Sequence, residues 1–184
     1  MTLTITDRGD VPDAALPLAE LAALLRLPNA WESEDGRAGR LRHLLRAALR
    51  DIEARTGRVL LRQEVRLQGH AAGGTDIGVP VRPAEQVVSL RVDGQAVAPI
   101  RYRLRADGQN VVLVMDRALR AGAGVELVVL AGHAAWADVP ATLAEAVLLT
   151  AEAFDVGPRE VSHESGLIGA LLAPFRTRRL GRAI

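Results

Sequence analysis

Residues 41–57 read LRHLLRAALRDIEARTG, and this stretch decides the kind of fold that the chain can adopt. Its apolar residues recur at the spacing of one face of an α-helix. They are Leu41, Leu44, Leu45, Ala48 and Ile52. Gly57 follows the pattern and predicts the helix end, because glycine readily adopts the left-handed conformation found there. The stretch therefore predicts an amphipathic helix whose apolar face needs a partner.

Helical patterns continue on both sides of this stretch. Towards the N-terminus they start near residue 16, so the first helical region is predicted to span residues 16–56. A second helical region is predicted over residues 140–173, where Leu143, Val147 and Phe154 share one apolar face. We expect that face to pack against Leu45 and Ile52, which would join the two ends of the chain in one helical core.

The region between them, residues 58–132, has the period of two that is typical of β-strands. Its clearest alternation runs from Ile100 to Arg105, where apolar residues and arginines take turns. Asp93-Gly94 and Asp107-Gly108 predict hairpin turns. The glycine-rich segment His70 to Gly78 predicts a mobile loop.

The order helix, strand, helix predicts an α+β fold. We expect a small helical bundle, built from the N- and C-terminal regions, with an antiparallel β-rich unit inserted into it. Residues 174–184 are expected to form an extended C-terminal tail. With 184 residues, the chain has the size of one domain.

Composition argues against most kinds of catalytic site. All 23 basic residues are arginine and cysteine is absent, so neither a phosphate-loop lysine nor a thiol nucleophile is available. The four histidines lie far apart and lack metal-ligand spacing; they are His43, His70, His133 and His163. The sequence thus predicts no catalytic residue, no metal site, no cofactor and no enzymatic activity.

The N-terminus, MTLTITDRGD, does not have the basic start and apolar run of a signal peptide. No stretch is long and apolar enough to cross a bilayer, so no membrane association is expected. The formal net charge of +1 argues against a dedicated, strongly basic nucleic-acid binder.

Two arginine clusters remain as candidate contact sites. Arg101, Arg103 and Arg105 would share one strand face, where they either grip phosphate or, as we favour, form a solvated face with ion pairs. The C-terminal tail interleaves arginines with apolar residues, which suits docking into a partner's groove better than simple solvation. Its candidate docking residues are Phe175, Arg176, Arg178, Arg179, Leu180 and Ile184.

Three further segments, taken in order, resemble a known family. The first is Leu18 to Leu27 with the helix ending Ala47 to Arg58; the second is Ala131-Gly132 followed by Val139 to Ala146; the third is Leu171 to Arg176 with Arg179-Leu180. In these segments the chain resembles the head–tail connector proteins of long-tailed phages, also called adaptor or head completion proteins. The alanine- and arginine-rich style is similar to the gene transfer agents of alphaproteobacteria, which are domesticated phage particles.

The resemblance implies a structural protein of a virion or phage-like particle, made in the bacterial cytoplasm. It implies a ring, usually dodecameric, between the portal protein and the neck, stopper or tail-terminator proteins. The ring would extend the channel through which DNA passes without sequence-specific binding, and the tail would reach the portal. Two alternatives stay open: a neck or tail-terminator protein of the same particle, and a small DNA-binding protein.

Overall fold

The computed structural model describes residues 3–28, 30–33, 36–107, 110–156 and 161–175. Contacts divide the chain into two compact units, each made of discontinuous segments. The β unit contains residues 1–11 and 61–134, and the helical unit contains residues 12–60 and 135–184. The β-rich segment is thus inserted into the helical unit, as predicted. That both units act as a single connector domain stays a prediction.

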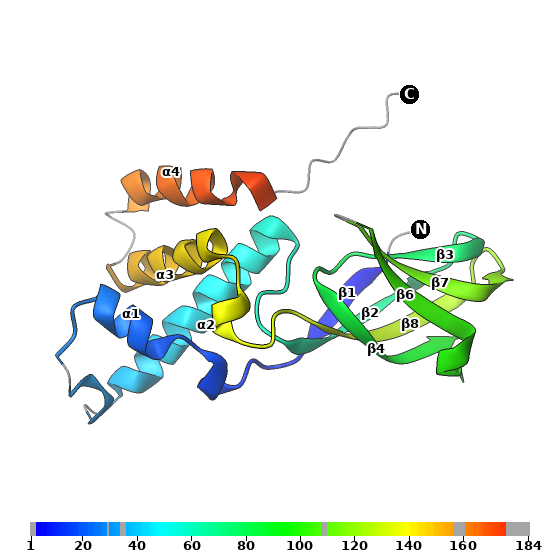
Figure 1. The fold of residues 1–184 in the computed structure, drawn as a ribbon, viewed down its shortest axis with the longest axis horizontal. Coiled ribbons are helices and arrows are strands. Elements are labelled where there is room, and N and C mark those ends of the chain that lie inside the picture. Colours follow the sequence, from blue (N-terminus) through cyan, green and yellow to red (C-terminus); the bar gives the residue numbers. More distant parts are fainter. Residues whose placement is uncertain (1–2, 29, 34–35, 108–109, 157–160, 176–184) are drawn as a thin grey trace. The chain divides into compact units, whose positions relative to one another are not determined.

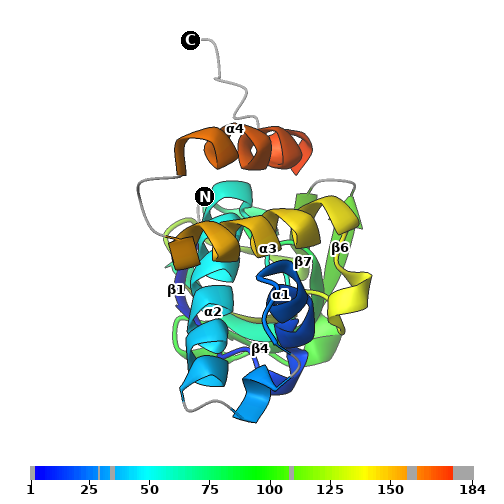
Figure 2. The ribbon, with the colours of Figure 1, turned by 90° about the vertical axis from the view of Figure 1, so that its left-hand side faces the viewer.

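The helical unit is built on one long amphipathic helix. Its helices, within the described residues, are α1 (Leu18–Leu24), α2 (Arg37–Thr56), α3 (Ala141–Val156) and α4 (Val161–Leu172). Helix α3 lies between α2 and α4, and α1 packs against both α2 and α3 (Figures 1 and 2). The helical unit therefore has the bundle architecture that the two helical patterns predicted.

Leucine, alanine and β-branched side chains fill the core of this bundle. Leu45 and Ile52 of α2 and Leu143 and Val147 of α3 are fully buried, which confirms the predicted packing of the two chain ends. The expectation for Phe154 was wrong: its side chain is 44% exposed. It lies in the last turn of α3, and spacing along a helix cannot show where the facing helix stops covering it.

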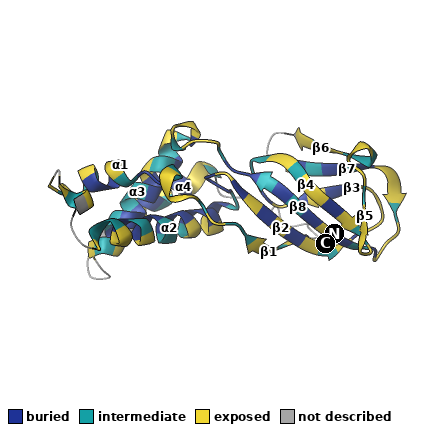
Figure 3. Cartoon of the chain, turned by 90° about the horizontal axis from the view of Figure 1, so that it is seen from below, coloured by how far each residue is buried: buried dark blue, intermediate teal, exposed yellow. Residues whose placement is uncertain are grey.

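The β unit contains two antiparallel sheets. The larger has the order β1-β2-β8-β4-β5 and the smaller the order β3-β7-β6. Their strands are β1 (Thr4–Arg8), β2 (Gln63–His70), β3 (Gly74–Val79), β4 (Ala84–Val92), β5 (Gln95–Ala96), β6 (Tyr102–Asp107), β7 (Asn110–Leu119) and β8 (Gly124–Ala131). Buried residues alternate with exposed ones along β2 and mainly with half-buried ones along β8, so one face of the larger sheet is apolar (Figure 3).

Turn residues at Asp93-Gly94 close the β4–β5 hairpin, as predicted. Both residues have positive φ angles, +48° and +77°, which is the conformation that a two-residue hairpin turn requires. Strands β6 and β7 form the second predicted hairpin, with Asp107 paired with Asn110. Gly108 of that turn lies outside the described residues.

Two expectations for this unit were wrong. Most of the segment from His70 to Gly78 is not a loop, because His70 ends β2 and Gly74 and Gly78 belong to strand β3, whose Ile77 is buried. Ile100 does not belong to the alternating strand, since Pro99 starts a short 3-10 turn over Pro99–Arg101 and β6 begins at Tyr102. The sequence also gave no indication that residues 4–8 form a strand; they pair with β2. The fold class itself, α+β with an inserted antiparallel unit, is confirmed.

Candidate functional site

Of the predicted docking residues, Phe175 is the one that the described part of the chain contains. It closes the 3-10 turn Ala173–Phe175 that follows α4. Its ring centre lies 5.1 Å from the guanidinium carbon of Arg58, a cation–π distance. Arg176, Arg178, Arg179, Leu180 and Ile184 lie outside the described residues. The first two residues of the expected extended tail, 174 and 175, thus belong to this turn, and Phe175 lies against Arg58, the second residue after α2.

Buried polar contacts build the end of α2, the first segment of the family resemblance. The Glu53 side chain is 2% exposed, and its Oε1 accepts a hydrogen bond of 2.8 Å from the backbone N–H of Leu60. Thr56 donates its hydroxyl to the carbonyl of Ile52 at 2.8 Å. Gly57 takes a φ of +65° and ends the helix. Such contacts fix the direction in which the chain leaves α2, and hence the position of Arg58.

Position 132, in the second segment of the resemblance, can hold only a glycine. Its φ is +100°, and a Cβ there would overlap the backbone of Leu61. At this place the backbone N–H of Arg62 donates to the carbonyl of His133 at 2.9 Å. The glycine therefore lets the first and last residues of the inserted segment lie side by side.

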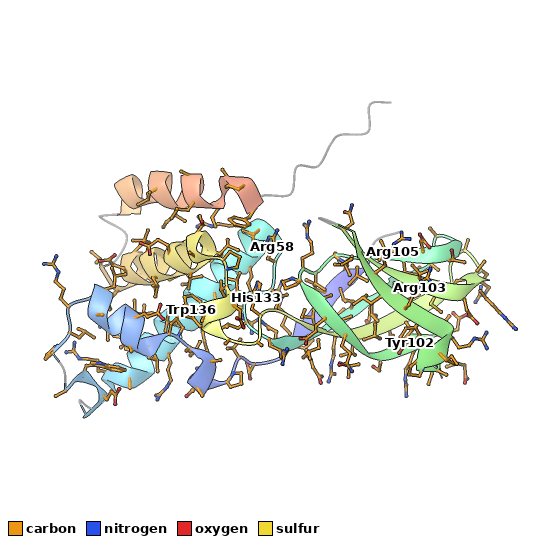
Figure 4. All side chains as sticks on the ribbon, in the orientation of Figure 1. Arg58, Tyr102, Arg103, Arg105, His133 and Trp136 are labelled. Carbon is orange, nitrogen blue, oxygen red and sulfur yellow. The ribbon has the colours of Figure 1, made fainter. Side chains whose placement is uncertain are left out.

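Of the three arginines predicted to share a strand face, Arg103 and Arg105 lie on β6, whereas Arg101 ends the 3-10 turn before it. Two of the three form ion pairs. Arg101 lies 2.6 Å from Asp116, and Arg105 lies 3.9 Å from Asp76. Arg103 is exposed and has no ion pair within the described residues; Figure 4 shows it beside Arg105 on β6. The interpretation as a solvated, paired strand face is thus confirmed for Arg105, whereas Arg101 is ion-paired but does not lie on the strand.

The histidines lie on different elements. His43 is on α2, His70 ends β2 and His133 follows β8, while the side chain of His163 lies outside the described residues. Across the described ranges, no group of three or more His, Cys, Asp or Glu side chains is placed to hold a metal ion. No helix in the same ranges is long and apolar enough to cross a membrane.

One surface feature was not predicted from the sequence. An open groove of about 570 Å³ lies in the β unit, lined by residues of β4, of the segment from β5 to Arg101, and of β7. Ile100 stands at this groove with 89% of its surface exposed. The alternation of residues 100–105 predicts a strand face for Ile100, and its proline neighbour is the sequence signal that it leaves that face.

Comparison with known proteins places these features in context. No protein-family model and no curated protein matches the chain. Solved structures do match: a chain of the neck of an empty GTA particle, determined with C6 symmetry, is 29% identical, with a TM-score of 0.78. That match covers 100% of this chain and 99% of the other.

Two further structures agree with it. A chain of the virion of a native gene transfer agent (GTA) particle is 28% identical, with a TM-score of 0.79. A chain of the neck of a native GTA particle, determined with C12 symmetry, is 28% identical, with a TM-score of 0.72. Each match covers 100% of this chain and 99% of the other.

These matches support a structural protein of the neck of a gene transfer agent particle. They agree with the localisation that the family resemblance implied, a phage-like particle at the junction of head and tail. The C6 and C12 symmetries of the neck structures further support a ring oligomer.

Proposed function

We propose that this chain is the adaptor subunit of a gene transfer agent particle, forming a ring between the portal and the rest of the neck. The observation that carries the proposal is the similarity to neck chains over 100% of this chain and 99% of the other. Both units take part in that similarity, so the β unit belongs to the shared architecture and is not an unrelated addition.

The chemistry of the chain supports a role in assembly. A formal net charge of +1 suits a channel wall along which DNA slides, because many free cations would hold the phosphates. The structures to which the chain is similar are components of particles, which supports a non-enzymatic role. The ring would extend the DNA channel and offer a docking surface to the neck and tail proteins.

We further propose that the C-terminal tail contacts the portal. Phe175 lies against Arg58 at the start of this tail, and four arginines with two large apolar residues follow within residues 176–184. The apolar side chains Leu180 and Ile184 would fill pockets, and the arginines would pair with carboxylates of the portal. Many equal contacts around a ring would offset the cost of ordering each tail.

Deletion of residues 176–184 tests this proposal. The truncated chain should fold normally but fail to join heads to tails, which gives filled heads without tails in electron micrographs. Replacing Arg176, Arg178 and Arg179 together by alanine should weaken attachment most at low salt, and the difference from the natural chain should shrink as salt rises, because salt screens the Coulombic part of the attraction. Arg103→Ala is the matched control, since it removes an exposed arginine of the β unit.

Two results would contradict parts of the proposal. Normal yields of tailed particles with the truncated chain would show that the portal contact lies elsewhere. Co-purification with tail proteins and not with the portal would instead identify the chain as a neck or tail-terminator protein.

A further inference from the structure

The side of α2 that faces away from its buried leucines carries a row of small and basic residues. The row follows the helical repeat of three to four residues. It consists of the exposed residues Gly39, Arg40, His43, Arg50 and Ala54, with the half-buried Ala47 among them. At 1.5 Å per residue, Arg40 and Arg50 lie about 15 Å apart along the helix. We call these residues the α2 row.

Positive charge is concentrated on this helix. Residues 37–56 contain six arginines but only two acids, Asp51 and Glu53. The carboxylate of Glu53 is buried and accepts the N–H of Leu60, so it does not reach the α2 row. The surface of α2 is therefore basic, although the formal net charge of the whole chain is only +1.

Carboxylates near α2 are engaged by other arginines and do not neutralise Arg50. Asp13 binds two further arginines of the same helix, and Asp51 binds Arg55 at 2.8 Å. Arg50 is exposed and has no ion pair within the described residues. Its guanidinium is thus available to an anion from outside the chain.

The earlier part of the α2 row can join in such a contact. Arg40 lies 2.7 Å from Asp155, but its side chain is 64% exposed. An exposed ion pair is weak and exchanges partners at little cost, so Arg40 can also face a second anion. His43 lies between Arg40 and Arg50, and a histidine ring carries an N–H donor whether it is neutral or charged.

The residue types of the α2 row fit a nucleic-acid backbone better than a protein surface. Protein interfaces are anchored by large apolar and aromatic side chains. No exposed residue of α2, which the structure describes over its whole length, is of that kind. Basic side chains match phosphate oxygens, and the glycine and alanines between them let a sugar–phosphate strand come close to the helix.

We propose that the α2 row contacts the phosphate backbone of DNA as it passes through the ring, with Arg50 at the centre of the contact. This inference rests on the proposed function, since it identifies the surface of the adaptor that faces the channel. A weak contact in each subunit, repeated around the ring, would centre the DNA without holding it.

The absence of cysteine from the chain makes a direct test possible. Ala54→Cys, one turn after Arg50, is labelled with azidophenacyl bromide in the full-length chain, mixed with a linear DNA duplex at about 50 mM salt and irradiated. The expected result is a covalent protein–DNA product on a denaturing gel. Adding Arg50→Glu should lower its yield at least about fivefold, and about 200 mM salt should lower it too, because the contact is electrostatic. Arg50→Lys should preserve most of the product.

Two matched controls use the β unit. Val88→Cys carries the same label at a position that is 47% exposed and should give little product. Arg103→Glu reverses another exposed arginine and should leave the yield from Ala54→Cys unchanged. Equal yields from the two labelled positions, or a yield that Arg50→Glu does not lower, would overturn the contact and leave the adaptor proposal standing.

Particles separate the remaining possibilities. The labelled Ala54→Cys chain is built into particles in place of the natural chain and irradiated there. Joining of position 54 to another protein would identify an acidic protein as the partner of the α2 row and would overturn the contact with DNA. Particles that lack the chain altogether would refute the proposed function, and with it the place of this contact in a channel.

Discussion

The two units of this protein differ in how many polar side chains they bury, although both carry ion pairs on their surfaces. The helical unit buries Glu53, Thr56 and Thr150, each at most 3% exposed, and supplies each with a backbone partner. The β unit places its ion pairs on the surface, where side chains such as Arg62 and Glu85 remain 42% and 48% exposed.

This difference separates fixed structure from adaptable surface. A buried hydrogen bond has strict geometry, and breaking it leaves a polar group without water. Surface ion pairs are weak and screened by salt, so they can exchange partners at little cost. The end of α2 is therefore expected to stay the same in free and assembled protein, whereas the charged surface of the β unit can adapt to a neighbour.

The largest expected effect breaks the core of the helical unit. Leu45→Ala removes a fully buried side chain between α2 and α3 and should lower the free energy of unfolding by about 2–5 kcal/mol. Phe154→Ala, at 44% exposure, should cost less than about 1 kcal/mol. Urea unfolding followed by circular dichroism measures both. Equal losses for the two variants would show that Phe154 belongs to the core after all.

A second change tests the buried polar end of α2. Glu53→Ala removes the acceptor of the Leu60 N–H and should cost about 1–3 kcal/mol, because that donor stays buried without a partner. Glu145→Ala, an exposed glutamate on α3, is the control and should change stability by less than about 0.5 kcal/mol. If Glu53→Ala lowers the free energy of unfolding no more than the control does, the buried contact at the end of α2 contributes no more to stability than an exposed side chain.

A smaller effect is expected from the surface of the β unit. Arg62 and Glu85 lie 2.7 Å apart and are both exposed, so a double-mutant cycle to alanine should give a coupling of about 0.2–1 kcal/mol. Coupling should fall as salt rises, because solvent ions screen exposed charges. A coupling that is large and independent of salt would mean that this pair behaves like the buried contacts of the helical unit.

The smallest effect concerns acid stability at the β4–β5 turn. The N–H of Gly124 donates to Asp93 at 2.8 Å, and Arg120 lies 3.1 Å away; both lower the pKa of Asp93 below its ordinary 3.8. Asp93 therefore stabilises the folded state above pH 3.8, and this contribution is lost as the pH falls through the lower, folded value. Asp93→Asn should flatten the loss of stability between about pH 5 and pH 2 in acid titrations of the urea midpoint. An unchanged slope would contradict the lowered pKa.

The helical core was predictable because its pattern is long and regular. Five apolar residues on one face of α2 fit the helical period of 3.6 and not the strand period of two. The bundle followed from pairing that face with α3. The exposed end of α3 was not predictable, since burial of Phe154 depends on where the neighbouring helices stop. Phe175 was singled out by composition alone, and its contact with Arg58 needed the fold.

The β unit was harder to predict because tertiary pairing decides its details. The glycines around 69–78 favoured a loop, but β7 provides a partner that turns residues 74–79 into a strand. Residues 4–8 are too short a pattern to predict a strand, and their partner β2 begins 55 residues after Arg8, at Gln63. The alternating pattern of residues 100–105 placed Ile100 in a strand. In the structure it belongs to the turn that Pro99 starts, which exposes it at the groove.

The close approach of Leu61 and His133 at Gly132 has a consequence for how such a protein can change over generations. An insertion whose two ends touch can be lengthened, shortened or exchanged without redirecting the helices that it interrupts. The β unit also takes its edge strand β1 from residues 4–8, ahead of the first helix. Any exchange of this unit by recombination must therefore bring the N-terminal residues along, and a chimaera that replaces residues 61–134 alone would keep an edge strand made for a different sheet.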